Sequence, residues 1–143
     1  EDEDKVVYLV EIIKPAVKVT VDKTEFIYLT VNEALSDITG MAKITLLKNI
    51  KECITITENQ KITLDLNGYE IKCSNKIASI INYGVLKIEG TSGKIVNDLG
   101  YAINNKQELH ISENIENSEI IIEGATSAIY MYILYHICAI MDI

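Results

Sequence analysis

Apolar and polar residues alternate from Ile62 to Cys73, with one interruption at Asn67-Gly68. A period of two is typical of a half-buried β-strand. Asn-Gly either closes a tight hairpin or forms a corner after which the chain bends and continues, because both residues tolerate a positive φ at little cost. A pattern that recurs at a fixed spacing would favour the corner.

The pattern does recur downstream. Ile-Asn followed by Leu-x-Ile occurs twice, at Ile81-Asn82 with Leu86 and Ile88 and at Ile103-Asn104 with Leu109 and Ile111. The corresponding alignment pairs Ile81 with Ile103, Ile88 with Ile111 and, upstream, Ile44 with Ile62. Each unit of roughly 20–25 residues then holds two or three short strands and must stack on a neighbour to bury its apolar side. The sequence therefore predicts a parallel β-helix.

The alternation also predicts which side chains point inward. These are Leu64, Leu66, Ile71, Leu86, Ile88, Ile103, Leu109 and Ile111, with Tyr69 and Cys73 at the same parity. Asparagines are expected at the corners of the coils, namely Asn67, Asn82 and Asn104. Asn82 and Asn104 would occupy equivalent corners. At such a corner the side-chain amide can form hydrogen bonds with the coils above and below. Sugar binding by these amides is the functional alternative. Gly90 to Gly93 is expected to be a turn between strands.

Residues 1–40 are expected to form an amino-terminal cap within one cooperative domain that also includes residues 41–143. Strands are predicted at Lys5–Ile13, which Pro15 ends, at 17–21 and at 26–29, with a turn over 22–25.

A helix is predicted from Thr30 to Thr39. Thr30 and Glu33 have capping-box spacing, and Gly40 stands where a helix C-terminal glycine belongs. The apolar stripe of this helix comprises Val31, Ala34, Leu35 and Ile38. Because the open end of a coil stack exposes backbone and apolar side chains, we expect the helix to plug that end.

The runs Lys43–Ile50, Ile62–Tyr69 and Ile80–Ile88 resemble right-handed β-helix modules with the pectate-lyase-like fold, which occur in secreted and wall-attached proteins of Gram-positive bacteria. The resemblance covers about residues 26–124. It implies a short right-handed parallel β-helix. Together with the amino-terminal hairpin and the capping α-helix predicted above, the expected fold class is all-β. The resemblance also implies a secreted or cell-surface location.

The charge and the cysteine count of the chain limit the classes of binding partner and of covalent cross-link that can be expected. The formal net charge of −8 opposes binding to nucleic acid and to anionic membranes, because such binding needs clustered basic residues on the protein. The acidic residues 1–4 are expected to be a solvated end without signal-peptide character, and calcium binding there is the alternative. Cys53, Cys73 and Cys138 are too few for a disulfide framework. Cys53 and Cys73 lie about one coil apart, so a bridge is conceivable, but a buried Cys73 thiol is the favoured interpretation.

The sequence offers no catalytic constellation. Polysaccharide lyases of the fold often use an Arg base and acid-bound calcium, whereas this chain has no Arg, and Asp65 and Asp98 are isolated. A hydrolase needs two carboxylates close together. Four glutamates recur across the coils and could be neighbours in space, namely Glu70, Glu89, Glu108 and Glu123. They alternate with inward Ile and Leu, so we expect them to form an outward, solvated face. His110 is expected to point outward, and neither His110 nor His136 has a metal or nucleophile partner at a recognisable spacing. We therefore predict no catalytic residue, metal or cofactor.

The favoured hypothesis is a non-catalytic β-helix module for display, adhesion or contact with a cell-wall or host glycan. The alternative is a polysaccharide-active lyase or hydrolase. Tyr83 and Tyr101 are the candidate platforms for a glycan. The apolar tail from Ala128 to Met141 is short for a membrane span. We expect it to cover the last coil or, slightly favoured, to pair with the same tail in a homodimer.

Overall fold

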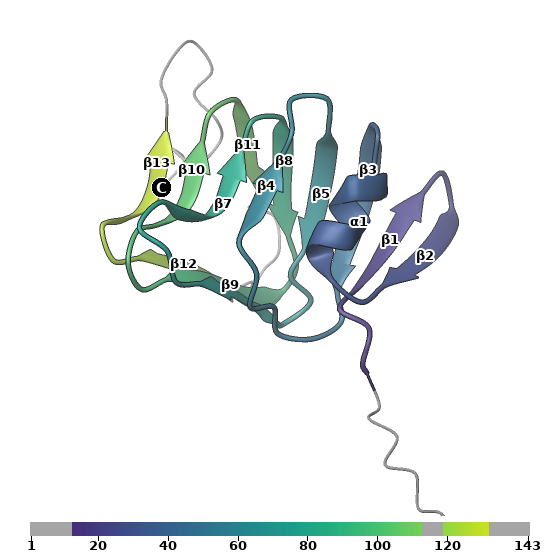
Figure 1. The fold of residues 1–143 in the computed structure, drawn as a ribbon, viewed down its shortest axis with the longest axis horizontal. Helices are drawn as coiled ribbons and strands as arrows, with labels where there is room; N and C mark the ends of the chain where they lie inside the picture. The colour runs from purple at the N-terminus through teal and green to yellow at the C-terminus, as the bar shows by residue number, and fades with distance from the viewer. Residues whose placement is uncertain (1–12, 113–118, 132–143) are drawn as a thin grey trace, which may run out of the picture.

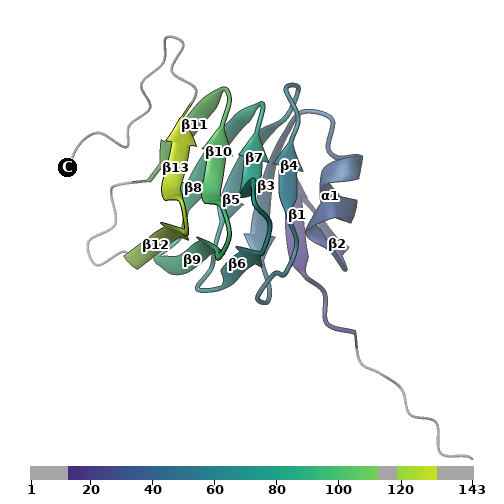
Figure 2. The same ribbon diagram turned by 60° about the vertical axis from the view of Figure 1, so that its left-hand side comes forward.

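The structure is a computed structural model that describes residues 13–112 and 119–131. Its strands wind into a β-solenoid of about 4 turns with parallel sheets. Helix α1 (Val31–Asp37) lies at one end of the stack (Figures 1 and 2). The predicted all-β fold, a parallel β-helix with an amino-terminal hairpin and a helix, is confirmed.

Three sheets form the walls of the solenoid. The six-stranded sheet contains, in order, β11 (Glu108–Ile111), β8 (Val85–Glu89), β5 (Lys61–Asp65), β3 (Met41–Leu46), β1 (Val17–Val21) and β2 (Thr24–Tyr28). The four-stranded sheet contains β13 (Ser127–Met131), β10 (Tyr101–Asn105), β7 (Ala78–Asn82) and β4 (Ile54–Ile56). The three-stranded sheet contains β12 (Glu119–Gly124), β9 (Ser92–Asn97) and β6 (Glu70–Cys73). Among the described strands, the antiparallel pairs are those of β1 with β2 and of β1 with β3.

The core lies inside the coils, because inward side chains of successive strands stack on one another. Ile44 pairs with Leu64, Leu64 with Ile88, and Ile88 with Ile111 along the six-stranded sheet. The first three are buried and Ile111 packs against them at the last coil. The other predicted inward residues are buried as well, namely Leu66, Ile71, Leu86, Ile103 and Leu109. Tyr69 is only partly buried against this core.

The predicted register is right in one place and wrong in two. Ile88 pairs with Ile111 as predicted. Ile103 pairs with Ile80 and not with Ile81, and Ile62 pairs with Ala42 and not with Ile44. Two identical residues in a row, as in Ile80-Ile81 and Asn104-Asn105, allow the Ile-Asn pattern to be aligned in either of two ways that differ by one residue. Hydrogen bonds between polar side chains of adjacent coils, such as the bond from Asn82 to Asn105, favour one of the two alignments.

The corner at Asn67-Gly68 is confirmed. Both residues have positive φ, 49° and 81°, and the chain passes from β5 in one sheet to β6 in another. The Asn67 side-chain amide donates to the Leu46 carbonyl in the preceding coil at 3.0 Å, and the Gly68 N–H donates to the Ser92 carbonyl in the following coil at 2.9 Å. The corner therefore holds three coils in register. The equivalent corner after β8 is shorter than predicted, because Gly93 already belongs to β9.

Buried asparagines form a ladder at another corner, but Asn104 is not its member. Asn82 pairs in register with Asn105, and its amide Nδ2 donates to Asn105 Oδ1 and to the Glu108 carbonyl, each at 2.7 Å. Asn82 Oδ1 also accepts from the Gly84 N–H at 3.1 Å. The prediction that Asn104 occupies the equivalent place is wrong by one residue, since the coils align so that these buried amides satisfy each other.

The amino-terminal cap consists of the β1–β2 hairpin, which extends the six-stranded sheet, and of α1. The hairpin turn is only Asp22-Lys23, both with positive φ, and is shorter than predicted. The whole predicted helix stripe is buried, namely Val31, Ala34, Leu35 and Ile38. The helix contacts β4 and the hairpin. It closes the amino-terminal end of the stack, as Figure 2 shows.

Both ends of α1 are bonded to the first coil. At the start, the Thr30 hydroxyl accepts from the Glu33 N–H, as predicted, and the Glu52 carboxylate accepts from the Val31 N–H at 2.9 Å. At the end, the buried Gln60 amide donates to the Leu35 and Ile38 carbonyls at 2.8 and 2.9 Å. The helix ends at Asp37, so Gly40 is not its C-terminal glycine.

Cys53 and Cys73 form a disulfide between adjacent coils, with their Cα atoms 5.2 Å apart. Cys73 is buried, as predicted, but the favoured interpretation of a free thiol is wrong. A coil length of about 20 residues places the two cysteines above one another, within the usual Cα separation of a disulfide.

Several expectations fall outside the described residues. These are the acidic end at 1–4, the strand at 5–13 apart from Ile13, Cys138, His136 and the tail beyond Met131. Ile13 is not in a strand. The start of the tail forms β13, which pairs with β10 as part of the last coil. In the described part of the chain, no helix has the length and apolar character that crossing a bilayer requires.

Candidate functional site

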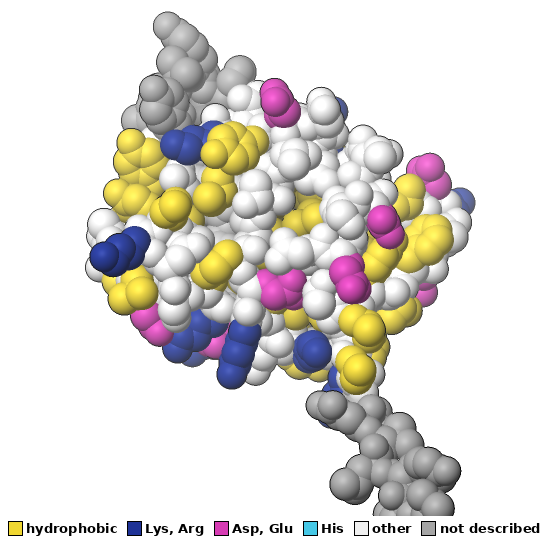
Figure 3. Space-filling model, in the orientation of Figure 1, with side chains coloured by type: hydrophobic (Ala, Val, Ile, Leu, Met, Phe, Trp, Pro, Cys, Tyr) yellow, Lys and Arg dark blue, Asp and Glu magenta, His cyan; other side chains and the backbone are white. Residues whose placement is uncertain are grey.

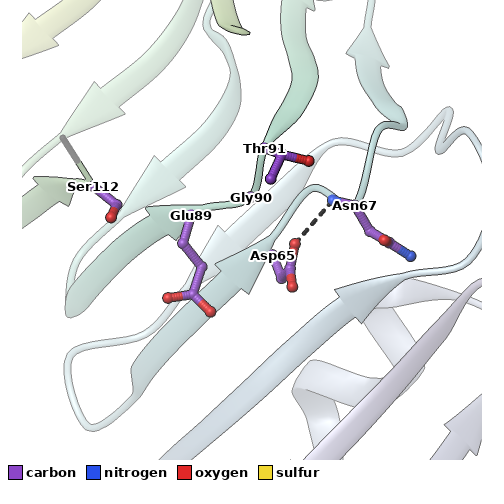
Figure 4. A pocket seen from close by; sticks show the side chains of 6 residues that line it. All are labelled: Asp65, Asn67, Glu89, Gly90, Thr91 and Ser112. Carbon is purple, nitrogen blue, oxygen red and sulfur yellow. Dashed lines mark hydrogen bonds between the residues drawn. The ribbon is translucent and has the colours of Figure 1, made fainter. Parts of the chain in front are cut away.

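A groove of about 360 Å³ lies on the outside of the solenoid, where the six-stranded sheet turns into the three-stranded one. Its lining comes from the same position of three successive coils (Figure 4): Asp65, Asn67, Glu89, Gly90, Thr91 and Ser112. Asp65 and Glu89 end the neighbouring strands β5 and β8 and pair in register. The expectation that Asp65 is isolated is therefore wrong, because coil stacking brings it beside a second carboxylate.

Local bonds fix the position of the Asp65 carboxylate. Its Oδ1 accepts from the Asn67 N–H at 2.9 Å, the bond drawn as a dashed line in Figure 4. A Cβ on Gly90 would lie 3.0 Å from the same oxygen, and Gly90 has a φ of 127°. Glycine at this position therefore lets the backbone of the next coil approach Asp65 closely.

Lys43, from the neighbouring strand β3, joins the two carboxylates. Its Nζ lies 3.0 Å from Glu89 Oε1 and 3.7 Å from Asp65 Oδ2, while Lys87 Nζ lies 3.8 Å from Glu89 Oε2. The hydrogen bond to Glu89 and the charges of both carboxylates raise the pKa of Lys43 against a smaller opposing effect of burial. Lys43 therefore stays protonated at neutral pH and acts as a counter-ion, whereas a lyase base must accept a proton.

The other predicted carboxylates are not gathered here. Glu108 lies on β11 and contacts His110 on the same strand. Glu70 and Glu123 lie on the three-stranded sheet, in register with Lys94 and Val96 respectively. The four glutamates that recur in the sequence are therefore spread over two sheets, which excludes a shared site for all of them.

Two tyrosines meet on the four-stranded sheet. The rings of Tyr101 and Tyr130 lie 5.0 Å apart between centroids, tilted by 38°, and Lys106 Nζ lies 5.7 Å from the centre of the Tyr130 ring. Tyr101 is half-buried, whereas Tyr83 and Tyr130 are exposed. Tyr101 is thus in contact with Tyr130, a residue of the apolar tail that was not expected to take part in a glycan surface.

One buried polar atom belongs to the residue that is paired with Tyr130 across the sheet. Asn104 pairs in register with Tyr130, and its Oδ1 is buried without a hydrogen-bond donor. A buried acceptor without a donor is unfavourable. Asn104 Oδ1 is thus an unsatisfied buried acceptor in the four-stranded sheet.

The remaining polar residues offer little chemistry. Asp98 pairs with Lys72 at 3.2 Å, next to the disulfide. Within residues 13–112 and 119–131, no group of three or more His, Cys, Asp or Glu side chains could hold a metal ion.

Comparisons with protein families, with curated proteins and with solved structures find no match to this chain.

Sequence reasoning missed the pairing of Asp65 with Glu89 and that of Tyr101 with Tyr130. Both pairs join residues of adjacent coils, so they depend on register between strands that are far apart in sequence. The signal that would have found the first pair was the register of Leu64 with Ile88, since each carboxylate directly follows one of these residues.

Proposed function

We propose that this chain is a non-catalytic β-helix module of a secreted or cell-surface bacterial protein, used for display, adhesion or glycan contact. The observation that carries the proposal is the pairing of the groove carboxylates with lysines. Lys43 bridges Asp65 and Glu89, and Lys87 adds a second cation. A glycosidase needs one carboxylic acid that keeps its proton and one free carboxylate, and a lysine-bridged pair suits neither role.

The disulfide supports the proposed location. Bonds of this kind form and persist in secreted and surface proteins and are rare in the reducing cytosol. Cys53 and Cys73 join two adjacent coils, with Cys53 just before β4 and Cys73 at the end of β6. The resemblance of the Lys43–Ile50 and Ile62–Tyr69 runs to pectate-lyase-like modules of Gram-positive surface proteins is part of the same proposal.

Contact with a glycan would involve the pair formed by Tyr101 and Tyr130. Tilted tyrosine rings offer an apolar surface with polar edges, and the Lys106 ammonium group lies beside the Tyr130 ring. We expect Tyr130→Ala to weaken retention of the chain on insoluble cell-wall polysaccharide. Met41→Ala is the control, since Met41 is an exposed apolar residue on β3 in the six-stranded sheet and lies outside the candidate glycan surface. Equal loss in both variants would rule out this surface.

Catalysis is tested separately. Wild-type chain incubated with uronate and neutral polysaccharides should release no new reducing ends and no unsaturated products. The alternative function, a polysaccharide-active enzyme, is favoured by the presence of Asp65 and Glu89 in one groove. Turnover that is abolished by Glu89→Gln and retained in Glu123→Gln would establish the enzyme and overturn the non-catalytic proposal.

A further inference from the structure

Strand β2 is the outermost strand of the six-stranded sheet. It pairs with β1 on one side, and in the described part of the chain no strand pairs with its other side. Every second residue of such an edge strand presents its N–H and C=O groups outward, so the edge is a template for another strand. Figure 1 places this edge beyond helix α1, at the end of the molecule.

The side chains of β2 leave this edge open. Proteins usually protect an edge with a lysine, a proline, an inward-pointing charge or a bulge, and β2 has neither lysine nor proline. Its apolar members Phe26 and Ile27 are 47% and 57% exposed, and the following Leu29 is 46% exposed. Hydrophobic side chains are visible over this hairpin in Figure 3. Exposed apolar residues gathered at an unpaired edge mark an interaction surface.

Charge argues for a second copy of this chain as the occupant. The chain carries a net charge of −8, which opposes self-association over most of its surface. The single acidic residue of β2, Glu25, already pairs with Lys18 on β1, with Nζ 3.3 Å from Oε1. The edge is thus an apolar and locally neutral part of an acidic molecule.

We propose that two copies of this chain associate by antiparallel pairing of their β2 strands about a two-fold axis. With the axis at Phe26, each Phe26 lies opposite its own copy, Glu25 lies opposite Ile27, and Thr24 lies opposite Tyr28. No like charges face each other, and aromatic and β-branched cross-strand pairs stabilise antiparallel ribbons. The pairing joins two six-stranded sheets and is closed by its symmetry. It differs from the tail-to-tail dimer expected from the sequence, because it uses the opposite end of the solenoid.

The experiment is sedimentation velocity of the full chain over concentrations from about 1 to about 100 μM, with two variants. Ile27→Lys adds a charge at the edge that resists strand addition. Leu99→Lys is the matched control, since Leu99 is 54% exposed and lies in the turn between β9 and β10, away from the edge. We expect the wild-type chain and Leu99→Lys to dimerise and Ile27→Lys to dissociate at least tenfold more readily. The thermal midpoint of each variant shows that the fold is intact.

A wild-type chain that is monomeric throughout this range, or a dimer that persists in Ile27→Lys, overturns the proposal. Hydrogen exchange at the β2 amides identifies the occupant. Protection that rises with protein concentration is expected for a second copy. Protection that is high at all concentrations means that another segment of the same chain covers the edge, and it overturns the proposal as well.

Discussion

Gly93 occupies a position inside strand β9 where a side chain has no room. A Cβ built there would lie 2.4 Å from the Leu66 Cβ and 2.9 Å from the Tyr69 carbonyl oxygen, and its φ is 146°. Two adjacent coils therefore approach each other closely at the Asn67-Gly68 corner, whose Gly68 N–H bonds to the Ser92 carbonyl. Gly40 is different, since nothing lies within 4 Å of its Cβ position.

We expect Gly93→Ala to destabilise the fold by about 2–4 kcal/mol, as a core residue that is overpacked at a strained φ does. The measurement is chemical denaturation followed by circular dichroism. Gly40→Ala is the control and should change stability by less than about 1 kcal/mol. A similar midpoint for the two variants would contradict the close packing of the coils at Gly93.

At the scale of elements, the plug helix depends on two side chains that flank β4. Glu52 accepts from N–H groups at the start of α1, and Gln60 donates to two carbonyls at its end. A helix of 7 residues is too short to be stable by itself, so packing and these bonds hold it at the end of the stack. Gln60 also accepts from the Thr57 N–H at 2.9 Å, which ties the same side chain to the first coil.

Replacing Gln60 with Ala should destabilise the protein by about 1–3 kcal/mol, because the Leu35 and Ile38 carbonyls both lose the donor that Gln60 supplies, and Leu35 keeps only the Ile38 N–H. Asn59→Ala, at the exposed neighbouring residue, is the control and should be close to neutral. Hydrogen exchange of residues 31–38 should accelerate in Gln60→Ala more than exchange in β10. Unchanged exchange over the helix would mean that Gln60 does not hold it.

The elements themselves were largely predictable from the sequence, but their register was not. The alternation around Leu64, Ile71 and Ile88 and the capping spacing of Thr30 are local signals, and the structure follows them. The pairing of Asn82 with Asn105 is decided by a bond between coils, which no local pattern contains. Because a one-residue shift exchanges the two faces of a strand, residues that meet only through register, such as Asp65 and Glu89, are found only once Leu64 is aligned with Ile88.

On the scale of the whole molecule, the stack resembles a one-dimensional array in which each coil contacts its neighbours. Its amino-terminal end carries the helix, the hairpin and the disulfide from Cys53 to Cys73. Cys53 directly follows Glu52, the residue that caps α1, so the disulfide connects the anchoring segment of the plug to the second coil. The described carboxyl-terminal coil, with β12 and β13, has no comparable covalent link within residues 13–112 and 119–131.

Reduction of this disulfide should therefore lower stability and should do so unevenly along the stack. Opening a loop with a sequence separation of 20 residues is expected to cost about 3 kcal/mol by the loop-entropy estimate. The measurement is urea denaturation of the oxidised chain and of the Cys53→Ala/Cys73→Ala variant, with Cys138→Ser as the control for the third cysteine. Hydrogen exchange should accelerate mainly in α1, β4 and β6, because each coil passes stability only to its neighbours. An equal acceleration in β13 would show that the solenoid unfolds as one unit, and an unchanged denaturation midpoint would show that Cys53 and Cys73 do not stabilise the stack by a covalent bond.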